Sequence, residues 1–264
     1  MLRARLVTAA VAIPALLALI FLAPPWAWGV LVVAVAGLGL IEYLWLAFPA
    51  QLSARAVGLL LGALVIGASL SMPAPGPRVT ASIAALVAVG LTYVVLWRTD
   101  FERGLTDLGV MTVGVLYTGL LLPHFYWLRH VSDGSQWITF VIAIAMGGDS
   151  GGYFVGHAFG RHKLVPRISP GKTVEGALGI LLMSLVVGVA AKLVLLPGRR
   201  WSEIMGLALT MAVIGQLGDL GESVMKRTFG AKESGWIFPG HGGVLDRIDS
   251  LLFPVTLVYY YVAR

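Results

Sequence analysis

Long apolar stretches recur along this chain from one end to the other. An α-helix needs about 20 mostly apolar residues to cross the hydrocarbon core of a bilayer, where every backbone polar group must be paired within the segment. The composition agrees, since 58% of the residues are hydrophobic and 12% are charged. Soluble domains, by comparison, are about half apolar and about a quarter charged. The sequence therefore predicts an all-α, polytopic integral membrane protein.

The apolar stretches predict about nine transmembrane helices, with edges defined to within several residues. The predicted spans are residues 6–23, 28–48, 56–72, 79–97, 109–128, 136–158, 174–197, 203–226 and 246–263. The last span is the weakest, because its purely apolar part is short for a full crossing, so about eight helices is the alternative. Within one membrane unit, we divide the chain into N-terminal helices over residues 1–135 and C-terminal helices over residues 136–264, which carry the candidate site.

Basic residues indicate the orientation of the chain. With nine spans and the N-terminus inside, 13 Lys and Arg side chains fall on the inner side and five on the outer side. Because Lys and Arg are enriched in cytoplasmic segments, we expect the N-terminus and the polar loops 159–173 and 227–245 to be cytoplasmic. We place the protein in the inner (plasma) membrane of the cell. The net charge of +6 mostly reflects this bias, and because the sequence shows no nucleic-acid-binding module we expect no nucleic-acid partner.

Ionisable groups occur within the eighth predicted span. If this segment stays helical, Asp219, Glu222, Ser223 and Lys226 lie on one face, because they are spaced at i, i+3, i+4 and i+7. Carboxylate and hydroxyl oxygens beside a lysine are suited to hold a divalent cation and a phosphate together. The alternative is a helix end that emerges into water, with Lys226 extending to the interface. The rarity of carboxylates at membrane depth favours a functional role for Asp219.

The stretch "PGHGGVLDRIDS", residues 239–250, is a second polar cluster. A helix that begins near Val244 presents Asp246 and Asp249 on one side, while Gly242 and Gly243 allow the backbone to approach a phosphate. Alternatively, the two aspartates only stabilise the first turn of the helix. Both explanations fit this stretch when it is taken alone.

A third cluster surrounds Asp149, which interrupts an apolar span and indicates a polar cavity. Glycines at positions 152, 156 and 160 repeat every four residues, which predicts close helix packing. The following loop contains Ser169 and Lys172, which are suited to a polyanion or follow from the cytoplasmic bias of basic residues, and a helix is expected to start at Thr173. Glu42, in the second predicted span, is expected to pair or hydrogen-bond between helices.

These motifs resemble the phosphatidate cytidylyltransferases, also called CDP-diacylglycerol synthases. The C-terminal signature of that family appears here as Ser223, Lys226–Arg227, Lys232–Glu233, Pro239–Gly240–His241–Gly242–Gly243 and Asp246–Arg247–Ile248–Asp249. The resemblance extends through Asp149 and the stretch "FGRHKLVPRISPGKTVEG", and residues 146–250 carry the strong match. The sequence departs from the pattern in three places. Glu233 replaces an aspartate, Gly171 replaces a common basic residue, and Gly151 and Gly152 make the segment after Asp149 looser than usual.

The resemblance implies that CTP and phosphatidate react to give CDP-diacylglycerol and pyrophosphate, with Mg²⁺ as cofactor, and it leaves a second, monovalent cation open. It assigns catalytic roles to Asp219, Asp246, Lys226 and Asp249, and metal binding to Asp219, Asp246, Asp249 and Asp149. The residues assigned to substrate binding are Ser223, Lys172, Ser169, His241, Gly242, Gly243, Arg247 and Arg227. We expect CTP, phosphatidate and membrane lipid as partners, and a homodimer.

Two other classes of protein remain as alternatives. A related membrane lipid kinase that uses CTP or ATP would share most of these groups. A secondary transporter would also place carboxylates within the membrane, but should show inverted repeats, and we see no internal repeat. The chain has no cysteine, which excludes disulfides, zinc–thiolate sites and cysteine nucleophiles.

Overall fold

The structure of the 264-residue chain is a computed structural model, and it describes residues 13–71, 74–235 and 242–264. Most of the described residues are helical. A short apolar helix, Ile13–Leu22, comes first. It is followed by α2 (Pro25–Ala47), α3 (Leu52–Leu70), α4 (Pro77–Trp97), α5 (Phe101–Gly119), α6 (His124–Arg129), α7 (Gly134–Phe159), α8 (Val174–Val194), α9 (Trp201–Thr228) and α10 (Leu245–Val262).

Within the described part of the chain, seven helical segments have the length and composition to cross a membrane, with α5 and α6 counted together as Phe101–Arg129. This confirms the prediction of an all-α, polytopic membrane protein. The first and ninth predicted spans fall on Ile13–Leu22 and α10, which are not among the seven. The described part of the first helix is short, and α10 carries Asp246, Arg247 and Asp249 near its start.

The helix predicted over 109–128 instead starts at Phe101. Asp100 caps it, because its carboxylate accepts a hydrogen bond from the backbone N–H of Arg103 at 3.1 Å, and Glu102 stabilises the positive end of the helix dipole. The predicted start was too late because it was set where the uninterrupted apolar run begins, whereas charged and polar residues are interspersed with apolar ones in the first two turns.

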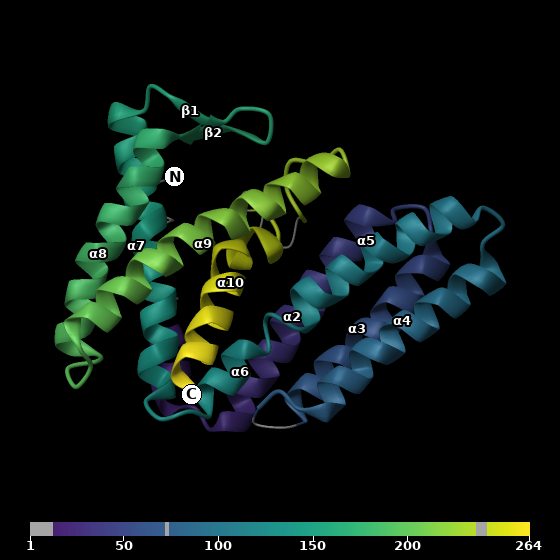
Figure 1. Cartoon of the computed structure of the whole chain (residues 1–264), viewed down its shortest axis with the longest axis horizontal. Helices are drawn as coiled ribbons and strands as arrows, with labels where there is room; N and C mark the ends of the chain where they lie inside the picture. Colours follow the sequence, from purple (N-terminus) through teal and green to yellow (C-terminus); the bar gives the residue numbers. More distant parts are fainter. Residues whose placement is uncertain (1–12, 72–73, 236–241) are drawn as a thin grey trace.

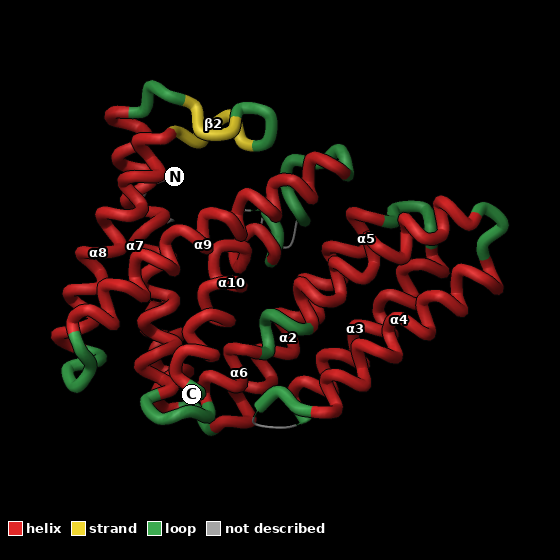
Figure 2. Tube along the Cα trace, in the orientation of Figure 1, coloured by secondary structure: helices red, strands yellow, loops and turns green. Residues whose placement is uncertain are grey.

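The predicted loop 159–173 contains a β-hairpin, which no pattern in the sequence had indicated. Strand β1 (Lys163–Val165) pairs antiparallel with β2 (Ser169–Thr173), with Lys163 opposite Thr173. Figure 2 shows this hairpin standing off the helical body beyond the ends of α7 and α8. Thr173 then caps α8 through a hydrogen bond from Gly176 N–H to its hydroxyl at 3.0 Å, so the predicted helix start is confirmed.

Helices α7 and α8 pack closely along a line of glycines. A Cβ at Gly152 would lie 2.7 Å from Ile180 Cγ1, and a Cβ at Gly151 would lie 2.6 Å from the carbonyl oxygen of Gly179. These distances leave no room for a side chain, which confirms the packing role predicted for Gly152.

The helices form two groups that meet at α6 and α10. Helices α2, α3, α4 and α5 contact one another, as do α7, α8 and α9, and Figure 1 shows these groups on opposite sides of the molecule. Helix α10 contacts α9, α7, α6 and α2. The C-terminal ends of α2, α7 and α9 and the N-terminal ends of α8 and α10 lie toward one end of the molecule, together with the hairpin (Figure 1). The predicted site residues lie at this end.

Candidate functional site

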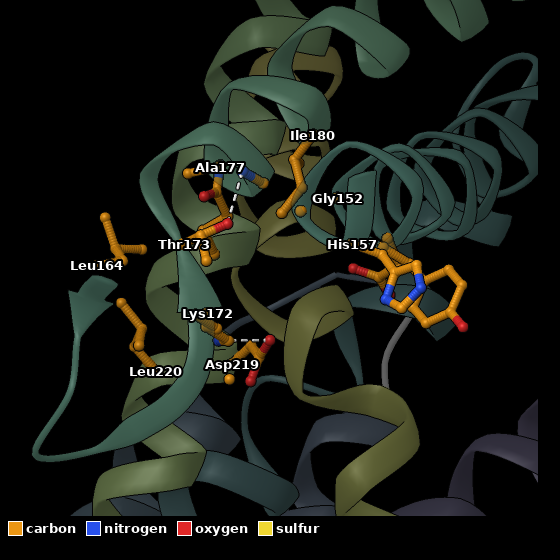
Figure 3. A pocket seen from close by; sticks show the side chains of 15 residues that line it. Gly152, His157, Leu164, Lys172, Thr173, Ala177, Ile180, Asp219 and Leu220 are labelled. Carbon is orange, nitrogen blue, oxygen red and sulfur yellow. Dashed lines mark hydrogen bonds and ion pairs between the residues drawn. The ribbon is translucent and has the colours of Figure 1, made fainter. Parts of the chain in front are cut away.

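The first part of the candidate site is a pocket of about 380 Å³ between α7, α8, α9 and the hairpin. Asp149, Lys172 and Asp219 line it, together with Thr173 and His157. Lys172 Nζ lies 2.6 Å from Asp219 Oδ2, and Figure 3 shows the two side chains pointing toward one another. Asp149 and Lys172 from the third polar cluster therefore share one cavity with Asp219 of the first, and the cavity carries both signs of charge.

The second part is an ion-pair network around Lys226. Its ammonium lies 2.5 Å from Glu222 Oε2 and 2.5 Å from Asp246 Oδ1. Glu222 is 1% exposed, and Ser223 is buried beside it on α9. Because α9 is continuous to Thr228, the predicted common face of Asp219, Glu222, Ser223 and Lys226 is confirmed.

Asp246 binds groups of Ser234 and Gly243, which precede α10 in the chain. Besides Lys226, its carboxylate accepts hydrogen bonds from Ser234 N–H at 2.9 Å, the Ser234 hydroxyl at 2.8 Å and Gly243 N–H at 2.8 Å. Gly242 has a φ of 76°, a left-handed conformation that favours glycine. The sequence suggested that the backbone here could approach a phosphate, but the Gly243 N–H donates instead to a carboxylate of the protein itself.

Glu42 also lies in the candidate site, although it is not among the predicted site residues. It lies on α2 and is 6% exposed. One of its oxygens accepts the N–H of Val244 at 2.9 Å, and the other accepts the N–H of Leu245 at 3.0 Å. The expectation that Glu42 would hydrogen-bond between helices is confirmed. Its position in an apolar span was the available signal, but nothing in the sequence pointed to α10 as its partner.

The third part is a largely apolar groove of about 480 Å³ between α2, α7 and α10. Its polar end is formed by Asp149, Asp246, Arg247 and Asp249, and its walls are mostly apolar, including Trp28 and Phe125. Asp249 is 9% exposed, and its Oδ1 accepts the N–H of Ser250 at 2.7 Å. Because Asp149 lines both this groove and the Lys172 pocket, the two cavities adjoin at one carboxylate.

Other predicted residues have different surroundings. Arg227 donates to the carbonyl oxygens of Ile168 and Ala231, which ties the hairpin to the end of α9. Ser169 begins β2 but does not line the pocket. His241 lies outside the described residues, so its predicted role stays a prediction.

The carboxylates at this end of the molecule are chemically suited to bind a divalent cation. Among the described residues, however, they do not surround a common metal position. Asp249 interacts electrostatically with Asp219, Glu222 and Asp149, and a cation relieves repulsion of this kind. Glu222 Oε1 is buried and has no hydrogen-bond partner among the residues that the structure describes. Among the described residues, no group of three or more His, Asp or Glu side chains is already gathered closely enough to hold a metal ion. Oxygen donors of this type fit Mg²⁺, which usually keeps several waters and substrate phosphates in its coordination shell.

Fold and site together define a polytopic α-helical membrane protein with a charged pocket and an apolar groove that adjoin at one end of its helices. The chain matches the cytidylyltransferase family over residues 3–264. This chain therefore belongs to the cytidylyltransferase family, as the resemblance predicted.

Three relatives show the same similarity. The chain is 39% identical over 174 residues to the phosphatidate cytidylyltransferase of Bacillus subtilis (strain 168). The aligned region covers 66% of this chain and 64% of that protein. It is 40% identical over 177 residues to that of Staphylococcus aureus (strain COL), covering 67% and 66%. It is 38% identical over 177 residues to that of Staphylococcus haemolyticus (strain JCSC1435), with the same coverage. The matched region thus spans slightly less than two-thirds of each relative.

Proposed function

We propose that this protein transfers CMP from CTP to phosphatidate, which forms CDP-diacylglycerol and pyrophosphate for phospholipid biosynthesis. The observation that supports this proposal most is the meeting of the two cavities at Asp149. A charged pocket suits a nucleotide triphosphate, and an apolar groove with a polar end suits a lipid that carries a phosphate. Family membership and the names of the relatives support the same reaction.

In this reaction an oxygen of the phosphatidate monoester bonds to the α-phosphorus of CTP while the bond to the β-phosphate oxygen breaks, and pyrophosphate leaves. The nucleophile is already ionised at neutral pH, so positioning and charge compensation contribute more than a strong base. Lys172 faces the pocket and would neutralise a phosphate of CTP once it exchanges Asp219 for the nucleotide. Arg247, at the polar end of the groove, would neutralise the lipid phosphate.

We propose Asp219, Asp249 and Asp149 as the carboxylates that would hold Mg²⁺, with Asp246 as a fourth. Bound Mg²⁺ would supply charge compensation for the phosphates. Lys226 forms ion pairs with Glu222 of α9 and with Asp246 of α10. It would thereby hold the C-terminal part of α9 against the start of α10. Gly242 and Gly243 would let the loop before α10 approach the nucleotide, with His241, Ser223, Ser169 and Arg227 as further substrate contacts. A second, monovalent cation would bind beside the same carboxylates.

The orientation is part of the proposal. We propose that the N-terminus and the hairpin end of the molecule face the cytoplasm, because CTP is supplied there and because basic residues predominate in those segments. The membrane would be the plasma membrane of a bacterial cell, as the organisms of the relatives suggest. We also propose a homodimer, and a division of labour in which residues 136–264 carry the catalytic groups and residues 1–135 support them.

One experiment tests the reaction directly. Purified protein in detergent receives CTP, phosphatidate and Mg²⁺, and pyrophosphate release and lipid product are followed together. Equal amounts of pyrophosphate and CDP-diacylglycerol are expected. A nucleoside diphosphate in place of pyrophosphate would instead identify a lipid kinase, and CTP left intact would leave the transporter as the alternative.

A further inference from the structure

Glu42 occupies a socket built by a segment about 200 positions further along the chain. The walls of the socket are Gly235, Gly243 and Ser234, and its donors are the N–H groups of Val244 and Leu245. A Cβ at Gly235 would lie 2.5 Å from Glu42 Oε1, and a Cβ at Gly243 would clash with Glu42 Oε2. The Glu42 carboxylate therefore fits in this socket only because neither position carries a side chain.

The socket lies at the start of α10, which has no cap of its own. Val244 is the N-cap residue and provides no side-chain hydrogen bond, so the first N–H groups of the helix need another acceptor. Glu42 supplies that acceptor from α2, and its negative charge lies at the positive end of the α10 dipole. The first turn of α10 carries Asp246, and the next turn carries Asp249.

Glu42 and Asp246 are also linked through one hydroxyl group. Ser234 Oγ lies 2.8 Å from Asp246 Oδ2 and 3.4 Å from Glu42 Oε2. A hydroxyl has a single proton to donate, and the shorter distance favours Asp246 as its acceptor. The two carboxylates together bind three consecutive backbone N–H groups, those of Gly243, Val244 and Leu245. The position of Asp246 therefore depends on Glu42.

We propose that Glu42 is a positioning residue for the transfer reaction, which fixes the first turns of α10 so that Asp246 and Asp249 face Lys226 and the carboxylates of α9 and α7. Glu42 acts through α10 and does not contact substrate. This role rests on the proposed function, because it assigns Asp246 and Asp249 to the reacting end of the molecule. It also accounts for the presence of a charged residue in an otherwise apolar helix, where its burial is costly.

The key variant is Glu42→Gln, which keeps the size of the side chain. Its amide has one acceptor oxygen, so one of the two backbone N–H groups would face an NH₂ group and lose its partner. We expect amide hydrogen exchange of residues 243–249 to become at least about tenfold faster, and kcat to fall at least about tenfold, as expected for one lost buried hydrogen bond. Glu42→Asp keeps both acceptors and should restore part of both losses.

Tyr43→Phe is the matched control. Tyr43 is the next residue of α2, is buried, and donates a cross-helix hydrogen bond to the carbonyl oxygen of Val110 at 2.8 Å, so its loss tests general destabilisation of α2. It should lower thermal stability without changing exchange in residues 243–249 or kcat. If Glu42→Gln does not fold, Gly235→Ala displaces the carboxylate without removing it, and the same exchange and kcat changes are expected.

Unchanged exchange in residues 243–249 of the variants, or a Glu42→Gln enzyme as active as Tyr43→Phe, would overturn the proposal. Equal losses in Glu42→Gln and Tyr43→Phe would also overturn it, because they would show only a structural role. If the unmodified protein makes no CDP-diacylglycerol, the proposed function fails, but the exchange measurement still decides whether Glu42 holds the start of α10.

Discussion

Lys172 and Asp219 join the hairpin to α9, with 2.6 Å between Nζ and Oδ2. Neither residue lies near the other in the sequence, and each came from a separate polar cluster. The pair closes one wall of the charged pocket, where an anionic substrate would meet the lysine and a cation would meet the aspartate. We therefore expect a substitution of Lys172 to affect the binding of the anionic substrate, and a substitution of Asp219 to affect the binding of the cation.

Lys172→Met should raise the CTP KM by about tenfold and change kcat less, because a charged hydrogen bond to phosphate is worth about 1.5–3 kcal/mol. CTP titrations of purified variants in detergent measure this change. Lys163→Met is the matched control, since Lys163 is on the same hairpin and donates to the carbonyl oxygen of Pro170 at 2.8 Å. An equal rise in KM in both variants would point to the hairpin as a whole.

Asp219→Asn should reduce kcat by at least about a hundredfold while the protein remains folded, because an amide keeps the shape but removes the charge that would hold a cation. Initial rates at several Mg²⁺ concentrations, with a thermal melt of each variant, measure it. The comparison is Asp107→Asn, at the distant α4–α5 end, where Asp107 pairs with Arg98. Normal rates for Asp219→Asn would remove Asp219 from the proposed metal site.

Asp246→Asn should lose both activity and stability, which separates it from Asp219→Asn. The Asp246 carboxylate binds Lys226, Ser234 and Gly243, and an amide cannot accept from all of them. We expect Tm to fall by about 4 °C or more, in addition to a loss of kcat. A variant that loses activity at an unchanged Tm would show that the loop contacts contribute little.

Gly243→Ala should lower Tm by several degrees, because a Cβ there would collide with Glu42 and Ser234. Gly221→Ala, within α9, is the control, since a Cβ at that position has no atom within 4 Å and alanine favours helix. Thermal unfolding in detergent distinguishes the two. Equal melting temperatures would mean that the socket adapts to a methyl group.

Single cysteines test the orientation, because the chain has none of its own. Gly171, on the hairpin, and Gly198, between α8 and α9, are exposed, and a Cβ at either has open space around it. An impermeant thiol reagent added to intact cells should label a cysteine at 198 and not one at 171. The reverse pattern would invert the proposed topology.

The sequence by itself determined the class of fold and most of the candidate site. Apolar length predicts helices without any tertiary information, because a bilayer requires backbone hydrogen bonds to be local. The 3.6-residue period placed Asp219, Glu222, Ser223 and Lys226 on one face, since helix geometry is fixed. The signature motifs led to the family, and the matched family confirms it.

Only the tertiary structure decided which of these groups meet. The Lys172–Asp219 pair, the Lys226–Asp246 pair and the contact of Glu42 with α10 join positions 20 to 203 residues apart, and no local period specifies such partners. The β-hairpin was also missed, because its strands are short and its pairing depends on where α7 ends and α8 begins. Side-chain partners across helices follow from how the helices pack, and packing is a property of the whole chain.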